Sequence, residues 1–175
     1  DGSGRENFVR RYVLRRAGPS GPVVRAETCV SFKPGALRIQ PIGRGFALAT
    51  PSRRVINAFG PRFFEAMRGL QIIRYYGYNR RCTVGRPGRA MVYWLRGAVV
   101  PVGPIPGEDC VQFNPDRTGV VFGGGGWRIV EGSRSLFTVP SRREGLRALS
   151  VLRRYRFTRS CFVGRPQASM SYLRR

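Results

Sequence analysis

The chain has 175 residues, of which 42% are hydrophobic, and it contains 11 phenylalanines, 7 tyrosines and 2 tryptophans. This apolar content can form a packed core and excludes the composition of a disordered tail. Its 32 basic residues, all arginine except Lys33, face 9 acidic ones, so the formal net charge is +23. A GC-rich genome explains arginine in place of lysine but not the shortage of carboxylates. We therefore expect an acidic partner or a polyanion to neutralise this charge.

No run of apolar residues approaches the roughly 20 that a membrane-spanning helix needs. The sequence begins at Asp1, which fits the removal of a signal peptide, although a trimmed chain would begin in the same way. The expectation about the compartment therefore depends on the cysteines.

Residues 1–25 precede the repeated part of the chain. Their apolar and basic residues alternate in pairs, which fits neither the period of a strand nor that of a helix. We expect a strand packed on the first repeat, with an adhesive basic arm as the alternative. Glycines and prolines at 18–22 then interrupt the pattern.

One sequence motif occurs twice. Cys-x-Val-Gly-Arg-Pro-x3-Met-x-Tyr begins at Cys82 and again at Cys161. Matching residues lie 81 positions apart from Cys29 and Cys110 onward, and 79 positions apart after residue 61. Such a match predicts a tandem repeat with one fold for both copies. The predicted organisation is a module at 26–96, an apolar Pro/Gly-rich connector at 97–107 and a second module at 108–175.

Short strands precede a helix in each copy. The first copy predicts strands at 30–32, 37–39, 46–49 and 54–58, and the second at 111–113, 120–122, 127–130 and 135–139. The last two strands of each set flank a turn and predict a hairpin.

The helices have different sequence features. Ser141 and Glu144 have the spacing of a capping box, and apolar residues follow at helical spacing as far as Tyr155. The apolar residues of the first helix are Phe63, Phe64, Met67, Leu70, Ile72 and Ile73, and Gly77 can end it. The Cys-x-Val strand, a Gly-Arg-Pro turn and a last strand, at 91–95 or 170–173, complete each copy. The predicted fold class is α+β, with two tandem copies of a small disulfide-stapled module, each a short antiparallel-rich sheet with one helix.

Four cysteines allow three pairings. The repeat favours Cys29–Cys82 and Cys110–Cys161, because both copies should form the same bond. Buried free thiols in a cytoplasmic protein are the alternative. A zinc site is disfavoured, because the sequence has no histidine and no close pair of cysteines. Disulfides predict an extracytoplasmic protein, either periplasmic or secreted.

The Gly-Arg-Pro turn has two interpretations. Arg86 and Arg165 can each offer a guanidinium group to a carboxylate, sulfate or phosphate. Alternatively, the motif is a tight turn beside a disulfide, in which the arginine bonds local carbonyls or pairs with Glu27 and Glu108. The structural interpretation is favoured.

The sequence offers few catalytic groups. It has no histidine to act as a base, and a capping role explains the repeated Glu65 and Glu144. The glycines at 123–126 lack the Gly-Lys-Ser/Thr ending of a phosphate-binding loop and predict a hairpin loop. We therefore expect no catalytic site, no metal and no cofactor, and the chain is predicted not to be an enzyme.

Arginines alternate with aromatic residues at 74–81 and 153–159, a pattern that can grip phosphates or stack bases. Alternatively, Tyr76 and Tyr155 lie in the core and the arginines reach solvent. The candidate contacts to an anion or a partner are Arg86, Arg165, Arg74, Arg80, Arg81, Arg153, Arg154 and Arg159.

The first function hypothesis is a non-catalytic subunit that docks on acidic protein surfaces in a larger assembly. Its candidate apolar docking residues are Tyr78, Trp94, Val99 and Val100. The alternative is a protein that binds a polyanion, either nucleic acid or an acidic glycan, with an affinity that falls steeply with salt.

Overall fold

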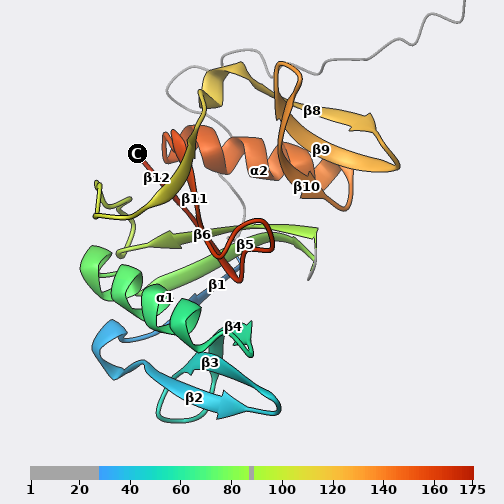
Figure 1. Cartoon of the computed structure of the whole chain (residues 1–175). Coiled ribbons are helices and arrows are strands. Elements are labelled where there is room, and N and C mark those ends of the chain that lie inside the picture. The colour runs from blue at the N-terminus through green and yellow to red at the C-terminus, as the bar shows by residue number, and fades with distance from the viewer. Residues whose placement is uncertain (1–27, 87–88) are drawn as a thin grey trace, which may run out of the picture.

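A computed structural model describes residues 28–86 and 89–175 (Figure 1). The strand or arm predicted at 1–25 lies outside these ranges. The described residues form two α-helices and twelve strands, so the fold is mixed α+β with mostly sheet. The predicted α+β class and the predicted order of strands and helix in each copy are confirmed. The single sheet predicted for each copy is wrong, because the strands of each half divide into two three-stranded sheets. The module boundaries at 26–96 and 108–175 stay a prediction.

The first half, residues 28–96, contains eight elements. They are β1 (Thr28–Ser31), the short 3-10 helix η1 (Pro34–Ala36), β2 (Arg38–Ile42), β3 (Gly45–Ala49), β4 (Val55–Gly60), α1 (Phe63–Tyr76), β5 (Arg80–Arg86) and β6 (Arg89–Leu95). The second half, residues 108–175, has the same order. Its elements are β7 (Asp109–Gln112), η2 (Pro115–Arg117), β8 (Thr118–Gly123), β9 (Gly126–Glu131), β10 (Arg134–Val139), α2 (Arg142–Arg154), β11 (Arg159–Val163) and β12 (Met170–Arg174).

The strands form four antiparallel sheets of three strands each, in the orders β2-β3-β4, β1-β5-β6, β8-β9-β10 and β7-β11-β12. Cys29 lies opposite Cys82 in the register of β1 and β5, and Cys110 lies opposite Cys161 in that of β7 and β11. Both pairs are disulfide-bonded, as the repeat predicted. Each disulfide lies within one half of the chain.

The two helices begin differently. The Ser141 hydroxyl accepts a hydrogen bond from the Glu144 backbone N–H at 3.2 Å, which confirms the predicted cap of α2. The capping role predicted for Glu65 is wrong, because α1 begins after Arg62 without a side-chain cap. The Glu65 carboxylate instead accepts hydrogen bonds from Arg62 and from the Ser169 hydroxyl of the second half.

Each of the two hydrophobic cores contains strands from both halves of the chain, so the halves exchange strands. The inner face of α1 shares one core with β3 and β4 and also with Val163, Met170 and Tyr172 from the second half. The inner face of α2 shares the other core with β8, β9 and β10 and also with residues of β5 and β6 from the first half. Figure 1 shows β5, β6, β11 and β12 between the two helices. Each repeated Cys-x-Val motif therefore helps to cover the helix of the opposite half.

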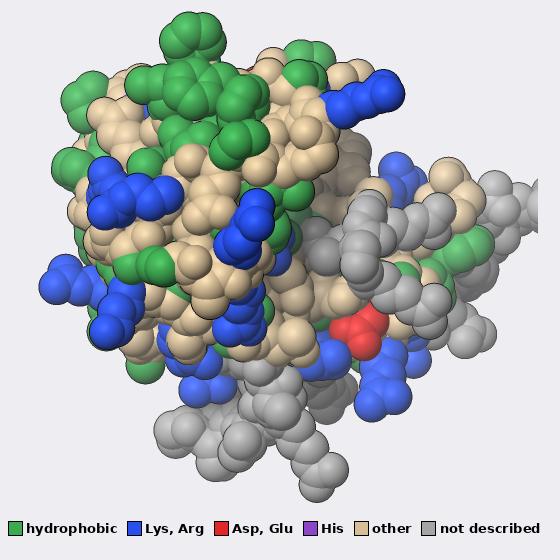
Figure 2. All heavy atoms as spheres, turned by 90° about the horizontal axis from the view of Figure 1, so that it is seen from below, with side chains coloured by type: hydrophobic (Ala, Val, Ile, Leu, Met, Phe, Trp, Pro, Cys, Tyr) green, Lys and Arg blue, Asp and Glu red, His purple; other side chains and the backbone are tan. Residues whose placement is uncertain are grey.

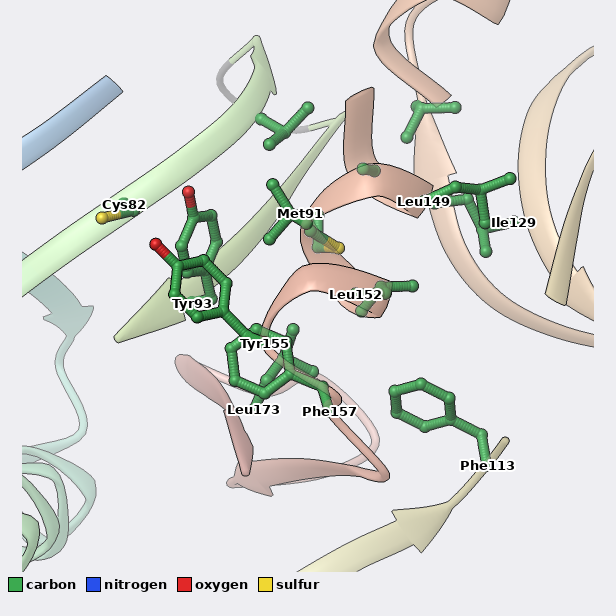
Figure 3. Packing of buried hydrophobic residues seen from close by; sticks show 14 of the residues in the cluster. Cys82, Met91, Tyr93, Phe113, Ile129, Leu149, Leu152, Tyr155, Phe157 and Leu173 are labelled. Carbon is green, nitrogen blue, oxygen red and sulfur yellow. The ribbon is translucent and has the colours of Figure 1, made fainter. Parts of the chain in front are cut away.

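Figure 3 shows this exchange beside α2. Met91 and Tyr93 of β6 lie beside Leu149, Leu152 and Tyr155, and all of them are buried. The period of two in a strand sends alternate side chains to opposite faces. Accordingly, the neighbouring Trp94 belongs to the other core, where its indole N–H donates to the Ser171 carbonyl of β12 at 2.9 Å.

The connector at 97–107 lies against the protein. Val100 belongs to the core beneath α2 and Ile105 to the core beneath α1, whereas Val99 and Val102 are exposed. Within the described ranges, both helices are too short or too polar to cross a membrane.

Candidate docking surface on helix α1

Helix α1 exposes large apolar side chains on its outer face. The exposed fraction is 82% for Phe64, 59% for Tyr75, 47% for Met67 and 41% for Phe63. A groove of about 660 Å3 runs along this face. The residues that line it are Ile39, Phe63, Met67, Leu70, Gln71, Arg74 and Tyr75. Figure 2 shows hydrophobic side chains gathered at the top of this view of the molecule.

The sequence assigned these residues to the apolar stripe of the helix, but the structure divides them. Ala66, Gly69, Ile72, Ile73 and Tyr76 are buried and form the inner face. A helix presents about one third of its surface to a core, so the additional apolar residues at 63, 64 and 67 fall outside that stripe. The first helix thus carries more apolar residues than its fold buries.

Three aromatic rings contact one another in a row at the N-terminal end of this surface. Phe46 of β3 contacts Phe63 edge-to-face, with ring centroids 5.1 Å apart, and Phe63 contacts Phe64 in the same way at 6.0 Å. Such contacts limit ring motion and contribute about 0.5–1.5 kcal/mol each beyond burial. The exposed Phe64 ring is therefore held from one side.

Basic residues lie on the same side of the molecule as the apolar face. Residues 28–76 contain eight basic residues and one acidic residue, Glu65. The Glu65 carboxylate is already engaged by Arg62 and Ser169. Figure 2 shows lysine and arginine side chains over much of the same side of the molecule. A partner that approaches this side meets positive charge beside an apolar patch.

The corresponding face of α2 has a different chemistry. At the offset of 79 positions, Phe63, Phe64 and Tyr75 correspond to Arg142, Arg143 and Arg154. Met67 corresponds to Leu146, which packs against the core beneath α2. The same fold therefore accepts arginine where α1 exposes aromatic residues. Comparison of the two copies at this offset was the available sequence indication of the α1 surface.

The sequence also proposed Tyr78, Trp94 and Val100 as exposed apolar docking residues, and this prediction is wrong. Tyr78 and Trp94 are fully buried and Val100 is 2% exposed, because all three fill the cores shared between the halves. Of the four residues proposed, Val99 is exposed, at 63%.

Several of the candidate arginines are engaged within the protein. Arg74 donates to the Leu37 carbonyl, and its counterpart Arg153 donates to the carbonyls of Pro115 and Thr118. These bonds attach the end of each helix to the segment in which β2 or β8 begins. Arg80 donates to the Gly97 carbonyl.

Other candidate arginines contact aromatic rings. The Arg81 guanidinium lies 5.6 Å from the centre of the Trp94 ring, and burial lowers the pKa of Arg81. The Arg154 guanidinium lies 5.4 Å from the Tyr155 ring. Arg159 is half-buried in β11.

The motif arginine of the second half forms an ion pair. Arg165 donates to the Asp109 carboxylate through two nitrogens, with Nε at 2.6 Å, and its guanidinium stacks on Phe162 at 4.9 Å. These bonds lower the pKa of Asp109. The structural interpretation of the motif therefore applies to Arg165, but the predicted partner Glu108 is wrong, because the Glu108 carboxylate pairs with Arg174 instead. The side chain of Arg86 and the proposed partner Glu27 lie outside the part of the chain that the structure describes.

A buried polar cluster, which the sequence did not predict, joins the two halves. The Glu108 carboxylate accepts hydrogen bonds from the hydroxyls of Tyr76 and Tyr172 and from the Arg174 guanidinium, with Nη2 at 2.7 Å. The Glu108 and Arg174 side chains are 5% and 7% exposed. Tyr76 belongs to α1, whereas the other three residues belong to the second half.

The cluster shifts the acid–base properties of its members. Burial alone raises the pKa of Glu108, but the hydrogen bonds from Tyr76, Arg174 and Tyr172 lower it below its ordinary value. Burial and the hydrogen bonds to Glu108 raise the pKa of Tyr76 and Tyr172. The sulfur atoms of Cys110 and Cys161 lie near this carboxylate but are joined in a disulfide, so they do not form a metal site with it.

Comparison of the chain with protein-family models, with curated proteins and with solved structures finds no match. The function is therefore argued from the residues and their geometry.

Proposed function

We propose that this chain is a non-catalytic subunit that docks on an acidic protein surface, as an extrinsic or structural part of a larger assembly. The observation that carries the proposal is the exposed apolar face of α1, which lies on a strongly basic molecule. Phe64 alone is 82% exposed, and a net charge of +23 strongly favours an acidic partner.

The two features have separate roles in this proposal. Apolar and aromatic side chains that become fully covered supply most of the affinity of a protein interface. Charge complementarity increases the rate of association and selects the partner. The arginines around α1 would therefore select an acidic surface, and the aromatic residues would hold it.

The compartment is part of the same proposal. Disulfides persist in oxidising surroundings and are rare in the cytosol, and this chain has two of them. We accordingly place its function outside the cytoplasm, either in a periplasm or after secretion.

The modular organisation is also a proposal. The repeated order of elements and the disulfide within each half support two tandem modules, at 26–96 and 108–175. In this view the two modules have corresponding core residues and differ in the residues on the exposed faces of their helices.

Polyanion binding is the second candidate, and the outer face of α2 favours it. Arg142, Arg143 and Arg154 are exposed there, and guanidinium groups bind phosphate and sulfate well. A polyanion would bind with an affinity that falls linearly with salt on a log–log plot. An apolar docking site loses less affinity to salt.

Isolation of the native protein at physiological salt tests the docking function. We expect a partner at a fixed stoichiometry, which stays bound when nuclease and glycosidase remove polyanions. Recovery of the chain alone as a monomer would refute the proposal. Loss of the partner after nuclease or glycosidase treatment would favour polyanion binding instead.

A further inference from the structure

We propose that the groove between α1 and β2 holds an acidic amphipathic helix of the partner protein. This inference rests on the proposed docking function and names the segment that the partner inserts. It follows from four observations: the difference between the two helices, the charge around the groove, the edge of the neighbouring sheet and the shape of the groove.

The fold does not require the apolar surface of α1. The second half builds the same elements with Arg142, Arg143 and Arg154 at the positions of Phe63, Phe64 and Tyr75. If these aromatic residues served folding alone, the second half would need them as well. The exposed part of their rings is therefore available to a partner.

The charge on both flanks of the groove selects an acidic occupant. Arg38 and Arg44 are exposed on the side of β2 and its turn. On the other side, Arg68 donates to Gln71 at 2.8 Å, and Gln71 lines the groove. Arg74 lines the groove directly. Carboxylates at the margins of an apolar helix would meet a guanidinium on either side.

The same charge argues against two other occupants. A second copy of this chain carries +23 and would bring more positive charge to a basic surface. Residues 1–27 of the chain itself contain six arginines and three acidic residues, so they are also basic. Neither segment complements the arginines that flank the groove.

The edge of the sheet favours a helix over an added strand. Strand β2 is an edge strand of its sheet and borders the groove through Ile39. However, Pro41 within β2 has no N–H to donate. The Leu37 carbonyl just before β2 already accepts hydrogen bonds from Arg38 and Arg74. An incoming strand would find an interrupted ladder of hydrogen bonds.

The length of α1 and the ridge along its outer face fit a short partner helix. The 14 residues of α1 extend over about 21 Å at the helical rise of about 1.5 Å per residue. Phe63, Met67 and Leu70 follow one another along α1 at spacings of four and three residues, which forms a ridge against which a second helix can pack. A partner helix of three to four turns would cover the apolar face from Phe64 to Tyr75.

A designed peptide tests this inference on the full chain. The probe is a fluorescein-labelled peptide of about 18 residues, with leucine along one helical face and glutamate elsewhere. The control peptide has the same composition plus a central proline, which breaks the helix. Fluorescence anisotropy should give a Kd at least about tenfold lower for the helical peptide than for the broken one. Equal binding of the two peptides would overturn the inference.

Two matched variants locate the binding site. Phe64→Arg copies the residue found at the same position of α2, and Phe122→Arg changes an exposed aromatic residue of β8, which is 64% exposed. Each variant removes one ring and adds one positive charge. We expect Phe64→Arg to weaken the helical peptide at least about tenfold and Phe122→Arg to leave it unchanged. If charge alone drove binding, both variants would bind the acidic peptide as tightly as the wild type or more tightly, and the inference would fail.

Two further measurements examine the other occupants. Tighter peptide binding after deletion of residues 1–27 would show that this segment covers the groove, and a dimer abolished by Phe64→Arg would show that a second copy does. Either result would overturn the inference. Isolation of the Phe64→Arg protein distinguishes a failure of the groove inference from a failure of the proposed docking function. If the native partner stays bound to this variant, docking stands and the groove is wrong, whereas a wild-type chain without a partner removes the docking function itself.

Discussion

Replacement of Glu108 by glutamine should destabilise the protein far more than other losses of a carboxylate. The Glu108 carboxylate accepts hydrogen bonds from Tyr76, Tyr172 and Arg174, and the Glu108 and Arg174 side chains are 5% and 7% exposed. Glu108→Gln leaves the Arg174 guanidinium buried without its counter-charge. Removing one partner of a buried ion pair costs about 3–5 kcal/mol, so we expect a loss of that size in the free energy of unfolding.

Urea unfolding followed by circular dichroism measures this loss as a lower midpoint with an unchanged slope. Glu144→Gln is the matched control, because Glu144 pairs with Arg147 at 3.1 Å but both side chains are more exposed, at 22% and 34%. Exposed pairs contribute about 0–1 kcal/mol. A similar loss in the two variants would refute the idea that the buried cluster joins the halves.

The stability difference between the wild type and Glu108→Gln should also depend on pH. The folded protein holds the pKa of Glu108 below its unfolded value of about 4.3. As pH falls, the unfolded chain therefore takes up the proton first, and the contribution of Glu108 is lost as pH falls through the folded pKa. The difference in stability between wild type and Glu108→Gln should stay constant above about pH 5 and decrease below pH 4. A constant difference down to pH 3 would contradict this reasoning.

Three further predictions concern other parts of the fold. Gly164→Ala should lower the free energy of unfolding by about 1–3 kcal/mol more than Gly125→Ala does. Both glycines have a positive φ, +84° and +81°, but only at Gly164 would a Cβ overlap a side chain, the Glu65 carboxylate. Equal midpoints of the two variants in urea would contradict this prediction. Cys82→Ala removes a disulfide between residues 53 positions apart. We expect it to lower the free energy of unfolding by about 4 kcal/mol, measured by thermal and urea unfolding. An unchanged stability would contradict this expectation. A protease site can be inserted after Val102, which is 72% exposed. After cleavage, both fragments should stay together in native gel filtration, whereas non-reducing denaturing electrophoresis should separate them, because each disulfide lies within one half. Fragments that separate under native conditions would refute the exchange of core strands.

The sequence predicted the elements better than their assembly. The offset between the copies located the strands, the helices and both disulfide pairs, because hydrophobic periodicity and repetition are local properties. The exchange of strands between the cores was not predictable in this way. Periodicity shows that Met91 and Tyr93 need an apolar cover, but α1 and α2 offer equivalent covers, and only three-dimensional packing decides between them.

The candidate site shows the same limit. Tyr78 and Trp94 each lie two residues before an arginine, Arg80 and Arg96. An aromatic residue near an arginine in the sequence is typical both of an exposed binding surface and of a core residue covered by a guanidinium that extends to solvent. The structure shows the second arrangement, with Arg81 over the Trp94 ring. Phe64 was predicted as part of an apolar stripe, and its exposure depends on where that stripe meets the sheet.

The exchange of core strands has a consequence for the order in which the chain acquires structure during synthesis. Helix α1 leaves the ribosome well before β12, yet Met170 and Tyr172 of β12 complete the core beneath α1. Part of the apolar inner face of α1 therefore stays exposed until the second half has been synthesised. Contacts between residues so far apart in the chain form slowly, and a waiting helix can accept the matching strands of another chain. Efficient folding of this protein thus depends on its two halves meeting within one chain before they meet those of a neighbour.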